Sequence, residues 1–109
     1  MRSKLSIATA LIVGAGIAAG SASGAGQKTV TIKNIDFTPA TVTIQHGGAV
    51  VWKWADRGVS HNVTSRGKAH FHSSSTRLTG TYRVVFRRAG TYRYVCTIHA
   101  NMRGKVVVR

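Results

Sequence analysis

Residues 90–108 read GTYRYVCTIHANMRGKVVV. At the start of this stretch Tyr92, Tyr94 and Cys96 alternate with polar residues, and the alternation resumes around Val106. Alternation with period two is typical of half-buried strands. We therefore predict two strands joined by a short loop. The Cys96 side chain should point inward where the first strand ends.

The same alternation recurs from residue 28 onward, and no helical periodicity is evident. Turn signals separate the short apolar bursts, namely Thr38-Pro39, Gly47-Gly48, Arg57-Gly58, Arg66-Gly67, Thr79-Gly80, Ala89-Gly90 and Gly104. Short strands at near-regular spacing favour an all-β sandwich with Greek-key connections. We predict about seven to eight strands.

The loop after the first of these strands carries the densest cluster of metal-binding side chains in the chain. Cys96, His99 and Met102 follow the pattern Cys-x-x-His-x-x-Met. A thiolate, an imidazole and a thioether are soft or borderline donors that suit copper. A fourth donor is needed, and His61, about 35 residues upstream in a loop that leads into a strand, is the natural candidate.

Structural roles remain open for these residues when each is taken alone. Cys96 could be a buried thiol and Met102 a gap-filler in the core. Cys96 is the single cysteine, so it cannot form an intramolecular disulfide. His70 and His72 would share one face of a strand as a possible accessory metal pair, but without a third ligand we expect ordinary surface histidines.

Several of these segments together resemble the small cupredoxins, the family of plastocyanin, pseudoazurin and amicyanin. The matching stretches are Asp36 to Ala40, Val50-Val51-Trp52, Ser60 to Val63, Gly90 to Cys96, and Met102 to Val108. The two-residue gap between His99 and Met102 is similar to that of amicyanin. The resemblance covers residues 28–109.

The resemblance implies one type 1 copper per chain. Cys96, His61 and His99 would form the ligand plane, with Met102 distant and axial. Asn62 would tie the two copper-binding loops together by hydrogen bonds, and bonds of this kind hold the orientation of the ligands. Ala100 stands where the family often has proline, which predicts a more flexible ligand loop.

The first residues predict export. Arg2 and Lys4 precede an apolar run that ends in a Gly/Ala/Ser stretch, as in a secretory signal peptide. The run is short for a membrane-spanning helix. We expect residues 1–25 to be cleaved, leaving residues 26–109 as one copper-binding domain in the periplasm or another extracytoplasmic space.

The chain is strongly basic. Sixteen Lys and Arg residues stand against Asp36 and Asp56, and removal of the signal leaves a formal net charge of +12. Such a field attracts acidic protein surfaces or anionic lipid headgroups. No nucleic-acid-binding motif is present, so we expect acidic redox partner proteins, with peripheral membrane contact possible and no nucleic acid. The family implies a monomer.

These observations predict one-electron transfer by copper rather than an enzyme, because four protein ligands leave no open coordination position. The main alternative is an exported protein for copper storage or delivery. A structural sandwich that binds polyanions is a further alternative.

Overall fold

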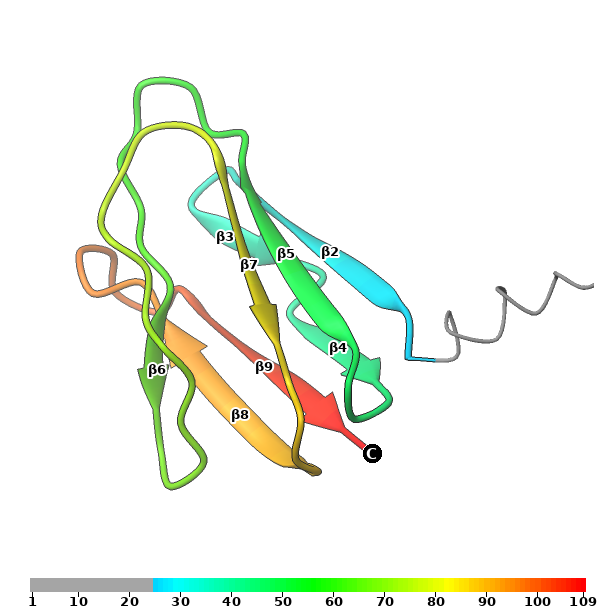
Figure 1. Ribbon diagram of the computed structural model, residues 1–109. Coiled ribbons are helices and arrows are strands. Elements are labelled where there is room, and N and C mark those ends of the chain that lie inside the picture. Colours follow the sequence, from blue (N-terminus) through cyan, green and yellow to red (C-terminus); the bar gives the residue numbers. More distant parts are fainter. Residues whose placement is uncertain (1–24) are drawn as a thin grey trace, which may run out of the picture.

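The computed structural model describes residues 25–109, which form eight strands and no helix (Figure 1). The strands are β2 (Gln27–Lys33), β3 (Asp36–Thr38), β4 (Thr41–Ile44), β5 (Ala49–Trp54), β6 (Thr64–Arg66), β7 (Thr81–Val85), β8 (Gly90–Val95) and β9 (Arg103–Val108). The expected signal peptide lies outside the described residues except for Ala25. Within residues 25–109, no helix suited to crossing a bilayer occurs.

The strands form two four-stranded sheets. One has the order β3-β2-β5-β7 and the other β4-β9-β8-β6. Strands β2 and β5 run parallel, as do β4 and β9, and the other pairs are antiparallel. The chain changes sheet at every connection from β3 to β8, as in a Greek-key sandwich. The predicted all-β sandwich is confirmed.

The core lies between the sheets and contains the inward residues of the alternating segments. Trp52 is fully buried, and its ring stacks on Phe71 with 5.5 Å between centroids. Tyr94 meets Trp52 edge-on at 5.2 Å and Phe37 at 4.7 Å. Aromatic pairs at these separations add to the stabilisation from burial. Tyr94 thus joins this aromatic layer to β8, the strand that ends one residue before Cys96.

Tyr94 and Gly104 fix the base of the loop between β8 and β9. The two residues are register partners, and a Cβ at position 104 would overlap the Tyr94 hydroxyl. Glycine is therefore required at this position so that β9 can cross the ring. Burial raises the pKa of Tyr94 to about 12. The two ends of the loop, Cys96 and Met102, thus sit on a tightly packed support.

Candidate metal centre

His61, Cys96 and His99 meet at one end of the sandwich. Cys96 Sγ lies 3.9 Å from His61 Nδ1 and 3.5 Å from His99 Nδ1. The donor atoms of the three side chains all lie within 4.8 Å of one another. Figure 1 shows the connections that follow β5 and β8 at the end away from the C-terminus. Two segments far apart in the chain thus supply one cluster of donors.

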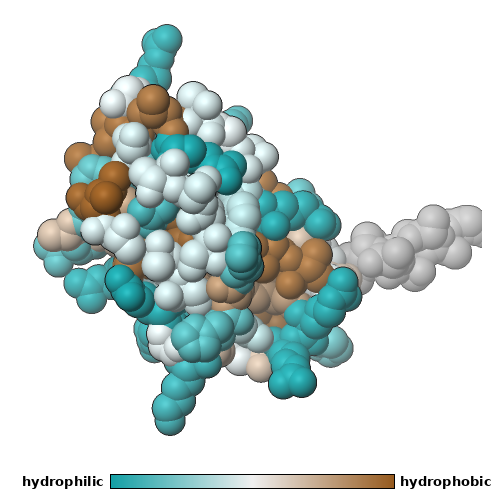
Figure 2. Space-filling view, turned by 60° about the vertical axis from the view of Figure 1, so that its left-hand side comes forward, coloured by the Kyte–Doolittle hydropathy of each residue, from teal (hydrophilic) through white to brown (hydrophobic). Residues whose placement is uncertain are grey.

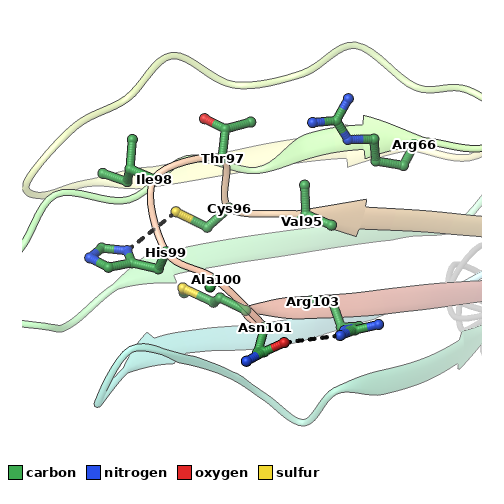
Figure 3. Close-up of a pocket in the computed structure, with 10 residues that line it drawn as sticks. Arg66, Val95, Cys96, Thr97, Ile98, His99, Ala100, Asn101 and Arg103 are labelled. Atoms are coloured by element: carbon green, nitrogen blue, oxygen red, sulfur yellow. Dashed lines mark hydrogen bonds between the residues drawn. The ribbon is translucent and has the colours of Figure 1, made fainter.

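The loop from Cys96 to Met102 closes on itself. The Cys96 N–H donates to the Met102 carbonyl at 3.0 Å, and the Met102 N–H donates to the His99 carbonyl at 3.4 Å. Asn101 has a φ of 68°, a left-handed conformation that asparagine tolerates. Figure 3 shows the Cys96 thiol and the His99 ring turned toward each other across the loop. Met102 is 2% exposed and lines the same pocket.

His61 is fully buried and is held on several sides. Its backbone N–H and carbonyl both bond to Arg77, and the Trp54 indole N–H donates to its carbonyl at 3.0 Å. Its Nε2 lies 2.8 Å from Asp56 Oδ2. An Nε2–H donated to this carboxylate leaves the lone pair of Nδ1 free on the side that faces Cys96. This is the tautomer that a metal-binding histidine needs.

Asp56 also anchors the hairpin between β2 and β3. The turn residues Asn34 and Ile35 both have positive φ, as in a type I′ turn, and the Ile35 N–H donates to Asp56 Oδ2 at 2.9 Å. That bond, and then the bond to His61, hold the pKa of Asp56 below its usual range. The carboxylate therefore stays charged beside the histidine.

The sequence analysis assigned no role to Asp56. A signal was nevertheless present, because Asp56 is one of only two acidic residues and lies five positions before His61. A carboxylate that close to a metal-ligand candidate is a common orienting partner.

Asn62 connects the two metal-binding segments. Its Nδ2 donates to Thr97 Oγ1 at 2.8 Å and to Thr76 Oγ1 at 3.0 Å. Its Oδ1 accepts from the Thr97 N–H at 3.1 Å and from Thr64 Oγ1 at 2.7 Å. Since Thr97 follows Cys96 directly, Asn62 holds the cysteine segment against the segment of His61.

His70 and His72 lie outside this centre. Both are exposed, in the segment between β6 and β7. The group of three metal-binding side chains found within residues 25–109 includes neither of them. His99, by contrast, is half-buried at the mouth of the centre, next to Ile98, which is 51% exposed.

The donor chemistry fits copper. One thiolate and two imidazoles converge without a carboxylate among them, and a buried thioether lines the same pocket. Two histidines and a cysteine with a weak methionine are typical of blue-copper electron-transfer sites. Sites for harder cations use oxygen donors instead.

Comparisons with known proteins agree with this chemistry. Residues 25–109 match the family described as copper binding proteins, plastocyanin/azurin family. Amicyanin-alpha of Methylorubrum extorquens is 35% identical over 93% of this chain and 87% of its own length. A reduced amicyanin variant superposes with a TM-score of 0.65 at 31% identity, covering 77% of this chain and 83% of that one.

A purple cupredoxin of Nitrosopumilus maritimus superposes with a TM-score of 0.68 at 25% identity, over 75% of this chain and 99% of that one. These matches extend across both sheets and the segments of the metal centre. The chain therefore belongs to the plastocyanin/azurin family of copper-binding proteins, as a cupredoxin that binds one type 1 copper ion and transfers electrons.

Proposed function

We propose that this cupredoxin is an exported one-electron carrier whose copper is held by Cys96, His61 and His99, with Met102 as a weaker fourth donor. The observation that carries the proposal is the convergence of the Cys96 thiol and two Nδ1 atoms within 4.8 Å. Bound copper supplies a one-electron couple between Cu(II) and Cu(I).

Hydrogen bonds from the surrounding residues fix the positions of the donor side chains. His61 is fixed by Asp56 and by its backbone bonds to Arg77. Asn62 ties the loop of Cys96 to the loop of His61. A centre whose ligands are already oriented needs little rearrangement when its charge changes. That property favours an electron carrier.

The same features disfavour an enzyme and a copper-delivery protein. Four protein donors leave no position for a substrate, whereas catalytic metal sites keep one open. Cys96 is 3% exposed and His61 is fully buried. A delivery protein must pass its ion to an acceptor, and donors this deeply buried hinder that transfer.

Electrons would enter and leave through the half-buried His99 beside the exposed Ile98. The partners would be redox proteins with acidic docking surfaces, because the chain carries a large positive charge. We place the mature domain, residues 26–109, outside the cytoplasm as a monomer. The single cysteine would be protected there from oxidation by its bond to the metal.

A titration of the purified protein with Cu(II), followed by visible absorption, tests the ligand assignment. We expect an intense blue thiolate-to-copper band that saturates at one copper per chain. Cys96→Ser should abolish the band. The control variant His70→Ala/His72→Ala should keep both the band and the stoichiometry. Only weak bands of tetragonal copper in the wild-type protein would refute the assignment.

A further inference from the structure

Three cationic side chains form a row across the outer face of the sheet β4-β9-β8-β6. Arg66 on β6 lies opposite Arg93 on β8, and Arg93 lies opposite Lys105 on β9. Side chains directly opposite in an antiparallel pair share one face, with Cβ atoms about 4.5–5.5 Å apart. Tyr92 and Tyr94 on either side of Arg93 are buried, so the row points away from the core.

No acidic residue neutralises this row. Of the two acidic residues, Asp36 lies opposite Lys33 on the other sheet, and Asp56 bonds to His61. Like charges directly opposite one another destabilise a sheet. The row of Arg66, Arg93 and Lys105 therefore has no acidic counter-charge among residues 25–109, and an external anionic surface would supply one.

The other sheet distributes its positive charge differently. Lys53 on β5 lies between Thr31 on β2 and Thr81 on β7. Arg83 lies opposite the uncharged Val51 and donates to Gln27. Cations are present on both faces, but they stand in a continuous row on one face only.

The row reaches the wall of the metal centre. Arg66 and Arg103 line the surface pocket that Cys96, His99 and Met102 also line. Figure 3 shows Arg66 and Arg103 on either side of the ligand loop, and Arg103 donates to Asn101 Oδ1 at 3.3 Å. Arg103 also shares a neighbouring pocket with Arg93 and Lys105. A molecule bound on this face would therefore touch the ligand loop.

The face offers charge and little exposed apolar surface. The large apolar side chains that are about half exposed are Ile35, Leu78 and Ile98, and none of them lies on a strand of this sheet. In Figure 2, long hydrophilic side chains project around separate apolar areas. Peripheral membrane binding usually adds buried apolar side chains to its cationic ones. An acidic protein surface fits this face better than a lipid surface does.

We propose that Arg66, Arg93, Lys105 and Arg103 form the docking surface for an acidic patch on the redox partner. The partner would lie over the sheet β4-β9-β8-β6, with its edge against the loop that carries Cys96 and His99. This inference rests on the proposed electron-carrier function and names the face that such a carrier would use. The positive charge of the row would raise the rate at which the partner associates and would orient the partner.

The test compares two triple variants that remove equal charge from the two sheets. One is Arg66→Gln/Arg93→Gln/Lys105→Gln, and the control is Lys28→Gln/Lys53→Gln/Arg83→Gln, whose three cations are exposed on the other sheet. The probe is an acidic plant-type [2Fe–2S] ferredoxin. Its Kd is measured by calorimetry at low ionic strength, with the copper-loaded and the metal-free protein.

We expect the row variant to raise the Kd at least about tenfold and to lose most of its salt dependence. The control should change the Kd less than about threefold. Equal losses in the two variants, or no binding of ferredoxin by the wild-type protein, would overturn the proposal. So would binding to phosphatidylserine vesicles that depends on the row while ferredoxin binding does not.

The copper spectrum keeps this result separate from the proposed function. All three proteins should show the same blue band and should be bleached alike by ascorbate, because none of the substituted residues is a ligand candidate. A wild-type protein without the band would refute the ligand assignment whatever the Kd values are. A normal band with equal Kd values in both variants would refute only the docking face.

Discussion

The two histidines of the copper centre are held in different ways. His61 is fully buried, its Nε2 bonds to Asp56, and its backbone pairs with Arg77 in an isolated antiparallel β-bridge. His99 is half-buried on a short loop, where its ring contacts Cys96 and the His61 ring and its carbonyl accepts from the Met102 N–H. One ligand candidate is thus anchored within the fold, while the other lies at the surface of the protein. In the proposed electron carrier, the first ligand would keep the geometry of the centre and the second would lie where a partner can approach.

Removal of each histidine ring should have the largest effect on the copper centre and tests most directly whether the two ligands differ in burial. His61→Gly and His99→Gly should both lose the blue band. Added imidazole should restore the band in His99→Gly, because that ring lies at the surface, but not in His61→Gly, where the vacated space is buried. The measurement is the blue absorbance against imidazole concentration. Equal rescue of both variants would contradict the difference in burial.

Tyr94→Phe tests the packed support beneath the surface loop. The folded-state pKa of Tyr94 is about 12, whereas an unfolded tyrosine titrates near 10. The folded state therefore holds the proton more tightly, and stability is lost as the pH rises from about 10 to 12. The loss from this group is about 2 to 3 kcal/mol.

The free energy of unfolding, measured by denaturant titration between pH 9 and 12, should fall less steeply in Tyr94→Phe than in the wild type. Near pH 7 the substitution should cost little, because the buried hydroxyl has no hydrogen-bond partner in the structure. Parallel curves for the two proteins would show that Tyr94 is not buried as described.

Asp56→Asn tests how His61 is held, because it weakens the hydrogen bond to the His61 ring and removes a charge beside it. The carboxylate places a negative charge on the far side of the His61 ring and favours the more positive oxidised metal. Its removal should raise the reduction potential by an amount on the order of tens of millivolts. Asp36→Asn is the matched control, because Asp36 bonds to the Phe37 N–H within its own hairpin. Equal potentials for both variants would exclude a specific role for Asp56.

Ala100→Pro should have the smallest effect on stability. It changes the loop next to His99 and leaves the surroundings of His61 unchanged. The substitution restricts the chain next to His99, and a compatible proline stabilises by about 0.4–1 kcal/mol. Thermal unfolding of the copper-loaded protein should shift upward slightly, with the blue band unchanged. A weakened band would show that the loop must adopt a conformation that proline forbids.

The strands and the donor residues could be predicted because they leave local patterns in the sequence. The alternation around Tyr94 and Trp52 predicted buried strands, because a residue's parity in a strand decides which face it occupies. The spacing of Cys96, His99 and Met102 predicted one loop rich in soft donors. Asn62 was expected, from the family resemblance, to link the two loops, and its bonds to Thr97 are consistent with that hypothesis.

Other features depend on contacts between segments that no local pattern contains. The bond from the Ile35 N–H to Asp56, which holds the carboxylate beside His61, requires the loop after β5 to lie beside the β2–β3 turn. The row of Arg66, Arg93 and Lys105 exists because three strands pair in one particular register. A shift of one residue would send these side chains to the other face.

The sequence by itself determined the fold class, the soft donors and the positive charge, because these depend on residue type, parity and short spacing. Only the tertiary structure decided which histidine is anchored, which acid orients it and on which sheet the cations line up. Those features depend on strand pairing and on loops meeting at one end of the sandwich. Several of these contacts join residues far apart in the chain, such as Ile35 with Asp56 and Arg66 with Arg93, where spacing along the chain carries no information about distance in space.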